Sequence, residues 1–337
     1  MSKKAQSIIW LIVAIIVFIL IGGVAYGIVR YSTQEVKNPE VTFEIEGYGN
    51  VKMVLYPEYA PNTVKNFIKL AQSGYYTGKV VYGKDEVSEY WGRNSEGNVE
   101  NPKLSTIDSS IEADSDSDHE YEINGEFVTN DFKQNTLSHK KGIVSMVRAD
   151  YTKQVKNLTT QSYNSANSQF TILTQDATDL NGLYAAFGEV TEGMDIVEKI
   201  YATATKTSEE DSKSSSSDYN ATSITAFEAM PVIKNVTVET YGVDYGMPET
   251  HEAFNYSQYL YKLIIEKAFE LTKVYGFEKV TARLLASELK CSTQPVFHAF
   301  RNMEELKEEV YKKTQKLFQE TMMQRPSDTE TPYFLSM

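Results

Sequence analysis

The sequence predicts a multidomain protein with three parts: an N-terminal transmembrane helix, a closed antiparallel β-barrel with two helices, and a C-terminal all-α part. Three observations predict this fold class. An almost wholly apolar run lies near the N-terminus, short apolar runs bounded by turn residues fill the middle, and only helical periodicity follows residue 255. A chain of 337 residues also suits about two globular domains, since a domain usually has roughly 100–200 residues.

The N-terminal apolar run, residues 8–29, is long enough to cross a hydrocarbon core about 30 Å thick. Lys3 and Lys4 precede it and Arg30 follows it. The two lysines favour a cytoplasmic N-terminus, which predicts a single-pass protein of the cell membrane with the bulk of the chain outside the cytoplasm. A cleaved signal peptide is the alternative, because residues 25–27 (Ala-Tyr-Gly) offer a small-x-small cleavage site.

The balance of acidic and basic residues differs between two parts of the chain after residue 30. Residues 31–250 carry 18 basic and 34 acidic side chains, whereas residues 256–325 carry 12 basic and 9 acidic ones. This difference suggests two units of different origin. The single cysteine, Cys291, excludes an intrachain disulfide, and the four histidines have no metal-ligand spacing. No glycine-rich phosphate loop is present either, so the sequence predicts no metal and no cofactor.

The middle part begins, after a linker at 31–40, with the alternation typical of β-strands. Residues 41–57 predict a hairpin around the turn at 47–50, and Pro61 then opens a helix that ends before Gly74. Short apolar runs predict further strands of a closed sheet, with a short helix between them and the last strand. These elements are expected at 143–147, 170–173 and 183–187 (strands), 194–200 (helix) and 232–241 (strand).

Two inserts interrupt this domain. Residues 96–118 are acidic and residues 203–223 are rich in serine, and both predict exposed loops because they hold too few apolar side chains to offset ordering entropy. The linker at 242–255 contains glycine, proline and polar residues, and it separates the β-rich domain from the helical part at 256–318 and the tail at 319–337.

Residues 41–241 resemble the cyclophilins, a family of peptidyl-prolyl isomerases. The resemblance rests on collinear motifs: YPEYAPNTVKNF at 56–67, GYYTG at 74–78, NGEF at 124–127, the segment 139–147, SQF at 168–170 and the segment 182–193. It implies an eight-stranded barrel capped by two helices and a shallow groove that binds proline-containing polypeptide segments. It also implies that an arginine donates hydrogen bonds to the prolyl peptide bond.

That arginine belongs to a Phe-His-Arg triplet in the family, and the corresponding residues here are Val81, Tyr82 and Gly83. Lys84 is adjacent and is considered as a substitute donor, although an ammonium lacks the planar fork of a guanidinium. The next pocket segment of the family is replaced by residues 88–93. We therefore expect weak or absent isomerase activity.

The resemblance also assigns a peptide-binding set, part of which departs from the family. Met146, Gln169, Phe170, Leu180 and Phe187 match binding positions, Tyr184 replaces a pocket histidine, and Trp91, with Arg93, offers a replacement surface. A family phenylalanine is Thr171 here. For Phe170, Leu180 and Phe187 the alternative is that they are core residues of the barrel.

Residues 256–318 resemble the helix-turn-helix module of the TetR family of repressors. Residues 276–281 match the turn and N-cap before the motif, 284–289 its first helix and 292–297 its recognition helix. The resemblance implies DNA contacts by Ser292, Thr293, Gln294 and His298. The family's turn glycine is Lys290 here. Its phosphate-contacting tyrosine is Phe297 and its lysine before Glu-Glu-Leu is Met303, and these two losses, with a charge of only +3 on residues 256–325, weaken the expected interaction with DNA. Short polar residues that open a helix are also commonly just caps.

Three functions remain open on the sequence. The first is a membrane-anchored cyclophilin-like foldase or chaperone with a protein-binding or vestigial helical appendage. The second is a membrane-tethered TetR-type transcription regulator with the cyclophilin-like domain as an intracellular sensor. The third is a chimera of two reading frames without a joint function.

Overall fold

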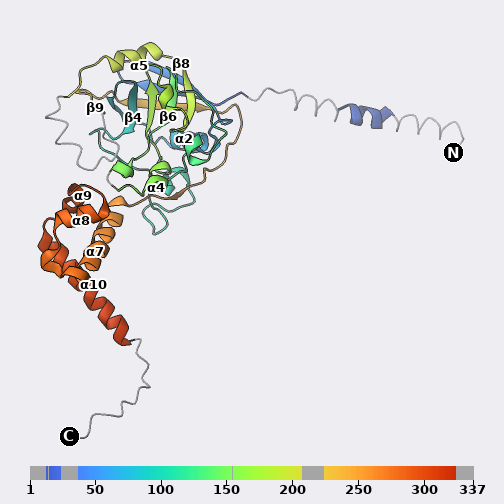
Figure 1. Cartoon of the computed structure of the whole chain (residues 1–337). Coiled ribbons are helices and arrows are strands. Elements are labelled where there is room, and N and C mark those ends of the chain that lie inside the picture. The colour runs from blue at the N-terminus through green and yellow to red at the C-terminus, as the bar shows by residue number, and fades with distance from the viewer. Residues whose placement is uncertain (1–12, 14, 24–36, 154, 207–223, 324–337) are drawn as a thin grey trace, which may run out of the picture.

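The computed structural model describes residues 13, 15–23, 37–153, 155–206 and 224–323 (Figure 1). A β-rich body spans most of this range, and a smaller helical module follows it (Figure 1). The Ser-rich insert predicted at 203–223 lies outside the described residues from 207 onward, as does the tail from residue 324.

The body is built on one nine-stranded antiparallel sheet with the strand order β10-β1-β2-β8-β6-β7-β4-β3-β9. Its strands are β1 (Glu40–Ile45), β2 (Gly49–Leu55), β3 (Val80–Lys84), β4 (Ser88–Arg93), β6 (Ile143–Met146), β7 (Phe170–Leu173), β8 (Ala186–Glu192), β9 (Thr225–Ala226) and β10 (Ile233–Glu239). The predicted hairpin, the strands predicted at 143–147 and 170–173 and the last strand are present. The strand predicted at 183–187 begins only at Ala186, because the chain is still in a turn at residues 181–183.

The sheet is curled but open, so the prediction of a closed barrel is wrong. Among the described strands, the edge strands β10 and β9 do not pair with each other. Instead β3, the neighbour of β9, meets the start of β10 through an isolated bridge between Val80 and Val232 and neighbouring backbone hydrogen bonds. Two causes are visible. Pro231 has no N–H to donate to a neighbouring strand, and the far end of β3 already pairs with β9 at Gly83 and Lys84.

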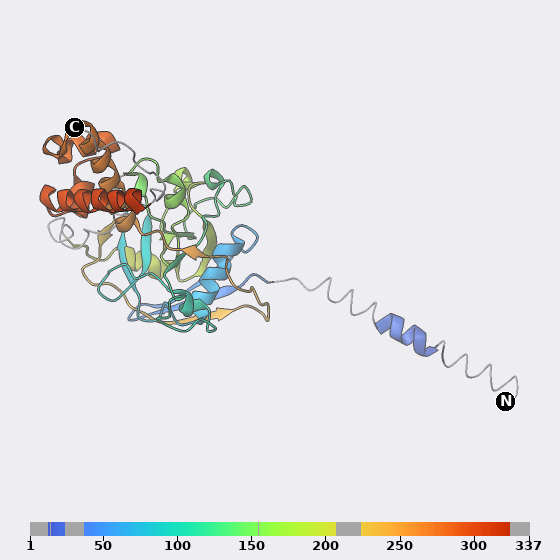
Figure 2. The same cartoon turned by 90° about the horizontal axis from the view of Figure 1, so that it is seen from below.

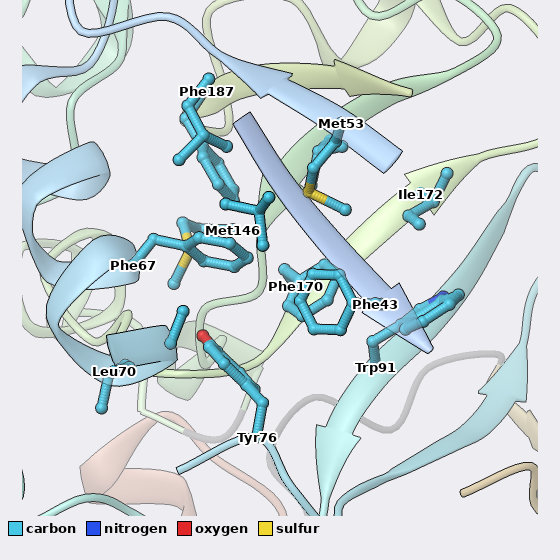
Figure 3. Close-up of a cluster of buried hydrophobic side chains, with 14 of the residues drawn as sticks. Phe43, Met53, Phe67, Leu70, Tyr76, Trp91, Met146, Phe170, Ile172 and Phe187 are labelled. Carbon is cyan, nitrogen blue, oxygen red and sulfur yellow. The ribbon is translucent and has the colours of Figure 1, made fainter. Parts of the chain in front are cut away.

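Alternating side chains of the strands fill the concave side of the sheet. Phe43 of β1 is fully buried and contacts the rings of Phe67, Tyr76, Trp91 and Phe170 at centroid distances of 5.6–6.2 Å (Figure 3). Such tilted and edge-on aromatic pairs contribute beyond their buried area. This aromatic cluster is the centre of the body's core.

Two helices cover the openings of the curled sheet. Helix α2 (Pro61–Gln72) begins with proline, as a helical first turn permits, and buries its apolar face against the core. Helix α5 (Met194–Tyr201) packs on β2 and buries Val197 and Ile200. Figure 1 shows α2 and α5 on different sides of the sheet, as expected of capping helices.

The connecting segments carry short elements of their own. The acidic insert 96–118, predicted as an exposed loop, is only partly exposed: it contains helix α3 and buries Pro102, Ile107 and Asp118. The short elements are α3 (Leu104–Ile107), β5 (Tyr121–Glu122), the 3₁₀ turns η1 (Val128–Asn130), η2 (Tyr151–Lys153) and η3 (Thr178–Leu180), α4 (Thr159–Tyr163) and β11 (His251–Glu252). Strand β11 lies in the predicted linker and pairs with β5.

The helical module contains α7 (Tyr256–Tyr275), the turn η4 (Phe277–Lys279), α8 (Ala282–Leu289), α9 (Gln294–Ala299) and α10 (Met303–Met323). Its buried cluster includes Leu260, Ile264 and Leu285, but also Tyr151 and Leu158 from the body. The two parts therefore share an apolar cluster. Figure 2 shows the module lying against one side of the body.

The predicted single-pass membrane localisation is corrected by the structure. In the ranges that the structure describes, no helix has the length and apolar character needed to cross a bilayer. Of the predicted span at 8–29, residue 13 and residues 15–23 are described and helical, and the others lie outside the described residues.

A buried carboxyl group lies inside the sheet. Glu89 and Trp91 alternate along β4 with Ser88 and Tyr90, and both are fully buried. Neither carboxyl oxygen of Glu89 has a hydrogen-bond partner among the described residues. Burial raises the pKa of Glu89 to about 9, against the opposite influence of Trp91 and Lys84. The folded protein therefore holds Glu89 protonated at neutral pH.

This protonation predicts a pH dependence of stability. Between the unfolded pKa of 4.5 and about pH 9, the folded chain keeps a proton that the unfolded chain has released, so the free energy of unfolding falls as the pH rises. The loss is at most about 1.4 kcal/mol per pH unit. We expect Glu89→Gln to flatten this slope in urea unfolding at pH 5, 7 and 8.5. Glu86→Gln, at an exposed neighbour, serves as the control, and equal slopes for wild type and Glu89→Gln would contradict the assignment.

Candidate functional site

A small pocket of about 180 Å³ opens on the convex face of β4, β6 and β7. Ser88 and Tyr90 reach it because they alternate with the buried Glu89 and Trp91. The other wall residues used below are Met146, Val147, Thr171, Leu180, Tyr184 and Ile224. This small pocket combines apolar side chains and hydroxyl groups with the charged residues Asp85, Arg148, Asp150 and Lys153.

Arg148 forms part of the same wall. Its guanidinium carbon lies 4.6 Å from the ring centre of Tyr184 and 5.0 Å from that of Tyr163, and its Nε donates to the carbonyl oxygen of Leu183 at 3.3 Å. Stacking on aromatic rings is a favourable setting for a guanidinium. Sequence reasoning missed Arg148, although a basic residue two positions after Met146 was the available signal.

Gly83 is closed off by strand β9. A Cβ atom at this position would lie 2.8 Å from the carbonyl oxygen of Thr225 and 2.9 Å from Cγ2 of Ile224. Gly83 also pairs with Ala226 in the sheet. The backbone of β9 therefore fills the space that a side chain at position 83 would need.

Lys84 does not replace the missing side chain. Its Nζ donates to the carbonyl oxygen of Tyr201 and lies 4.6 Å from the ring centre of Tyr201 and 5.8 Å from that of Phe227. Lys84 lines neither the small pocket nor the larger one described below. The predicted substitute donor thus faces the α5 end of the sheet.

Arg93 instead brings a guanidinium close to Gln169. Its Nε donates to the side-chain oxygen of Gln169 at 3.1 Å, and its guanidinium carbon lies 3.9 Å from the ring centre of Tyr82. Tyr82 precedes Gly83 in β3. Arg93 therefore reaches the outer face of β3 from the neighbouring strand and holds the Gln169 side chain, which is only 6% exposed.

A second, large pocket of about 480 Å³ adjoins the small one and shares Val147 and Arg148 with it. Gln169 and Asn167 lie on its inner side, and Glu122 lines it as well. Burial raises the pKa of Glu122 to about 7; a hydrogen bond from the backbone N–H of Phe254 lowers it, and the nearby Glu120 raises it further. The large pocket thus combines polar walls with acidic groups.

Three residues of the predicted peptide-binding set belong to the sealed core. Trp91, Phe170 and Phe187 are fully buried, and Figure 3 shows them pointing into the aromatic cluster. Trp91 stacks on Phe170 with a centroid distance of 5.7 Å. Met146, Leu180 and Tyr184 line the small pocket, and Gln169 lines the large one.

The sequence pattern described as "Cyclophilin type peptidyl-prolyl cis-trans isomerase/CLD" matches residues 40–219, more than half of the chain. The chain belongs to the cyclophilin family. A second pattern, that of bacterial regulatory proteins of the tetR family, matches residues 264–310.

Individual relatives agree with this assignment. The chain is 29% identical over 181 residues to peptidyl-prolyl cis-trans isomerase CYP23 of Arabidopsis thaliana, covering 51% of this chain and 64% of that protein. It is 30% identical over 183 residues to a probable peptidyl-prolyl cis-trans isomerase of Brucella suis, covering 52% of this chain and 80% of that protein.

Among solved structures, a cyclophilin-type isomerase of Cryptosporidium parvum, crystallised in the presence of the dipeptide Ala-Pro, is 18% identical with a TM-score of 0.41. The match covers 59% of this chain and 98% of that one.

Among cyclophilins, this chain differs at the position expected to hold the catalytic arginine. Position 83 does more than lack a side chain, because β9 occupies the space into which an arginine at this position would project. Ile224, next to β9, contributes to the small pocket instead.

The tetR-like module has the arrangement of a helix-turn-helix. Thr281 caps α8 by accepting a hydrogen bond from the N–H of Leu284 at 3.2 Å, as the sequence predicted. Lys290 ends α8 in the left-handed conformation, with φ 55°, where the family has glycine. In and before α9, Ser292, Gln294 and His298 are exposed and Thr293 is half-buried.

Metal binding has no structural support in the part of the chain described. Over those residues, no three His, Cys, Asp or Glu side chains gather closely enough to hold a metal ion. The four histidines include His139, which is buried and lies with Nε2 3.0 Å from the hydroxyl oxygen of Ser145. This contact ties the segment before β6 to Ser145, the residue of β6 that precedes Met146.

The closure at Gly83 predicts the effect of adding a side chain there. Gly83→Ala should lower the free energy of unfolding by about 1–3 kcal/mol, because β9 must move to admit the Cβ atom. Urea unfolding of the full chain measures this loss. Thr171→Ala, which removes atoms from the small pocket without a clash, is the comparison. An unchanged unfolding midpoint for Gly83→Ala would show that β9 does not press on Gly83.

Proposed function

We propose that the body binds extended, proline-containing polypeptide segments as a foldase or chaperone, and that its isomerase activity is weak or absent. One observation carries this proposal: the small pocket is open, whereas β9 fills the space beside Gly83, the position where the family would have its arginine. Leu180 and Tyr184 offer apolar contacts suited to a proline ring, while β9 excludes an arginine at position 83; Met146 borders the pocket but is buried with the core.

Gln169 supports peptide binding in particular. Its side-chain oxygen accepts from Arg93, and its amide nitrogen donates to no described residue. Gln169 lines the large pocket, so this N–H₂ group is placed to donate to a backbone carbonyl of an extended chain. Backbone contacts of this kind hold peptides without demanding a particular sequence.

Catalysis needs more than binding. The prolyl bond has a rotation barrier of about 18–20 kcal/mol from its partial double-bond character, and donation to the prolyl nitrogen weakens that character. Two basic side chains, Arg148 and Lys153, line the small pocket. Arg148 lies over the rings of Tyr163 and Tyr184 and donates from Nε to the carbonyl oxygen of Leu183, and Nζ of Lys153 lies 3.9 Å from a carboxylate oxygen of Asp150. We infer that neither is fixed as a donor to a prolyl nitrogen.

We expect two results from peptides that contain one proline. The full chain should bind them, and Leu180→Ala or Tyr184→Ala should weaken binding about tenfold, measured by NMR titration. Isomerisation, measured by NMR exchange, should be at least about a hundredfold slower than with peptidyl-prolyl cis-trans isomerase B of Bacillus subtilis, because losing a fixed donor typically costs that much.

The control for binding is Met247→Ala, an exposed position outside both pockets. Isomerisation at the rate of the Bacillus enzyme would contradict the weak-activity part of the proposal. Failure of every proline peptide to bind, or equal effects of Met247→Ala and Leu180→Ala, would contradict the binding part.

DNA binding by α9 is the second candidate function, supported by the tetR-family match at 264–310 and by the exposed Gln294 and His298. The electrostatics oppose it, because the module carries only a small basic excess and is attached to an acidic body. Phe297, at the position of the phosphate-contacting tyrosine, is 55% exposed and has no hydroxyl group to donate.

We therefore expect the full chain to bind duplex DNA no tighter than a dissociation constant of about 10⁻⁶ M at physiological salt, the non-specific range. Fluorescence anisotropy over a salt series measures this, and the full chain is required because the module shares its apolar cluster with the body. Sequence-selective nanomolar binding that is lost in Gln294→Ala/His298→Ala would instead establish a DNA-binding regulator.

A further inference from the structure

The segment between β6 and β7 connects the peptide-binding face to the helical module. Directly after Arg148 it leaves the sheet, and Tyr151 stacks on Tyr256 at the start of α7, with ring centres 5.1 Å apart and planes 5° apart. Val155 and Leu158 continue the same contact in the shared apolar cluster. The module is therefore packed on the loop that carries one wall of both pockets.

The chain that enters the module is fixed to the body as well. Strand β11 pairs with β5, and the N–H of Ala253 donates to the carbonyl oxygen of Glu120 at 3.0 Å. The next N–H, that of Phe254, donates to the carboxylate of Glu122, also at 3.0 Å. These contacts hold residues 252–257 along the rim of the large pocket.

The large pocket consequently has walls from both parts of the protein. Asn167 and Gln169 come from the β-rich body, whereas Phe254, Asn255 and Ser257 come from the linker and the first turn of α7. The small and large pockets share Val147 and Arg148. Since the two pockets share these wall residues, a side chain close in sequence to a proline in the small pocket is the one that would enter the large pocket.

We propose that the helical module completes the peptide site, with its first turn forming the outer wall of a pocket that selects a long basic side chain close to the proline. This inference rests on the proposed function. It gives the helical module a role in peptide selection, and this role requires neither DNA nor a separate protein partner.

The charges of the large pocket support the choice of a basic side chain. Glu120, Glu122 and Glu252 line it. Arg148 is the opposing cation, but its guanidinium lies over the rings of Tyr163 and Tyr184 and donates to a backbone carbonyl. A lysine or arginine of the peptide would meet the exposed carboxylates of Glu120 and Glu252 at the pocket rim, and the buried Glu122, whose pKa of about 7 a nearby cation would lower.

The test is a matched pair of tryptophan variants in the full chain. Ser257→Trp places bulk in the outer wall of the large pocket, and Gln258→Trp places the same bulk on the next residue of α7, which does not line it. The probes are two sets of otherwise identical single-proline peptides, with lysine or alanine at each of the two positions on either side of the proline. Binding is measured by NMR titration.

The wild-type chain and Gln258→Trp should bind one of the lysine peptides at least about tenfold more tightly than its alanine counterpart. Ser257→Trp should lose that preference while binding the alanine peptide as before. A preference that survives in Ser257→Trp, or that is absent from the wild type although proline peptides bind, overturns the inference. If the wild type binds no proline peptide at all, the proposed function fails first and this inference fails with it.

Discussion

The packing of Phe43 against the aromatic rings around it is the interaction on which the rest of the body depends. Phe43 reaches rings from α2, β4 and β7 and from the segment before β3, so one side chain fixes the distance between the helix and three parts of the sheet. Because interiors are close-packed, the curvature of the sheet follows from this cluster. Because side chains alternate along a strand, Ser88, Tyr90 and Thr171 then face outward and line the small pocket.

Local signals in the sequence were sufficient for most elements. The period-two pattern at 41–57, the proline that opens α2 and the Thr281 cap each depend on neighbouring residues, and each is present in the structure. Closure of the barrel was predicted wrongly because it depends on a long-range competition for the edge of β3. That competition is decided by Gly83, whose lack of a side chain admits β9.

The candidate site was predictable in composition but not in orientation. Motif order placed Met146, Leu180, Tyr184 and Gln169 near one another, and they line the two pockets. It did not reveal that Trp91 faces the core, because β3 and β4 pair with register shifts on both sides of Val81 and each shift changes which face a residue presents. The positions of Arg148 and of the wall formed by residues 252–257 depend on how the loop at 149–158 packs against the helical module. None of the sequence motifs that indicated the fold includes this loop.

The apolar cluster shared by the loop at 149–158 and the helical module also has a consequence for the order of folding. Tyr151, Val155 and Leu158 find their partners about a hundred residues later in the chain, in α7 and the helices that follow. Until those helices form, the loop has no apolar surface to cover it. Docking of the C-terminal helices therefore covers apolar side chains of this loop that the rest of the body leaves uncovered.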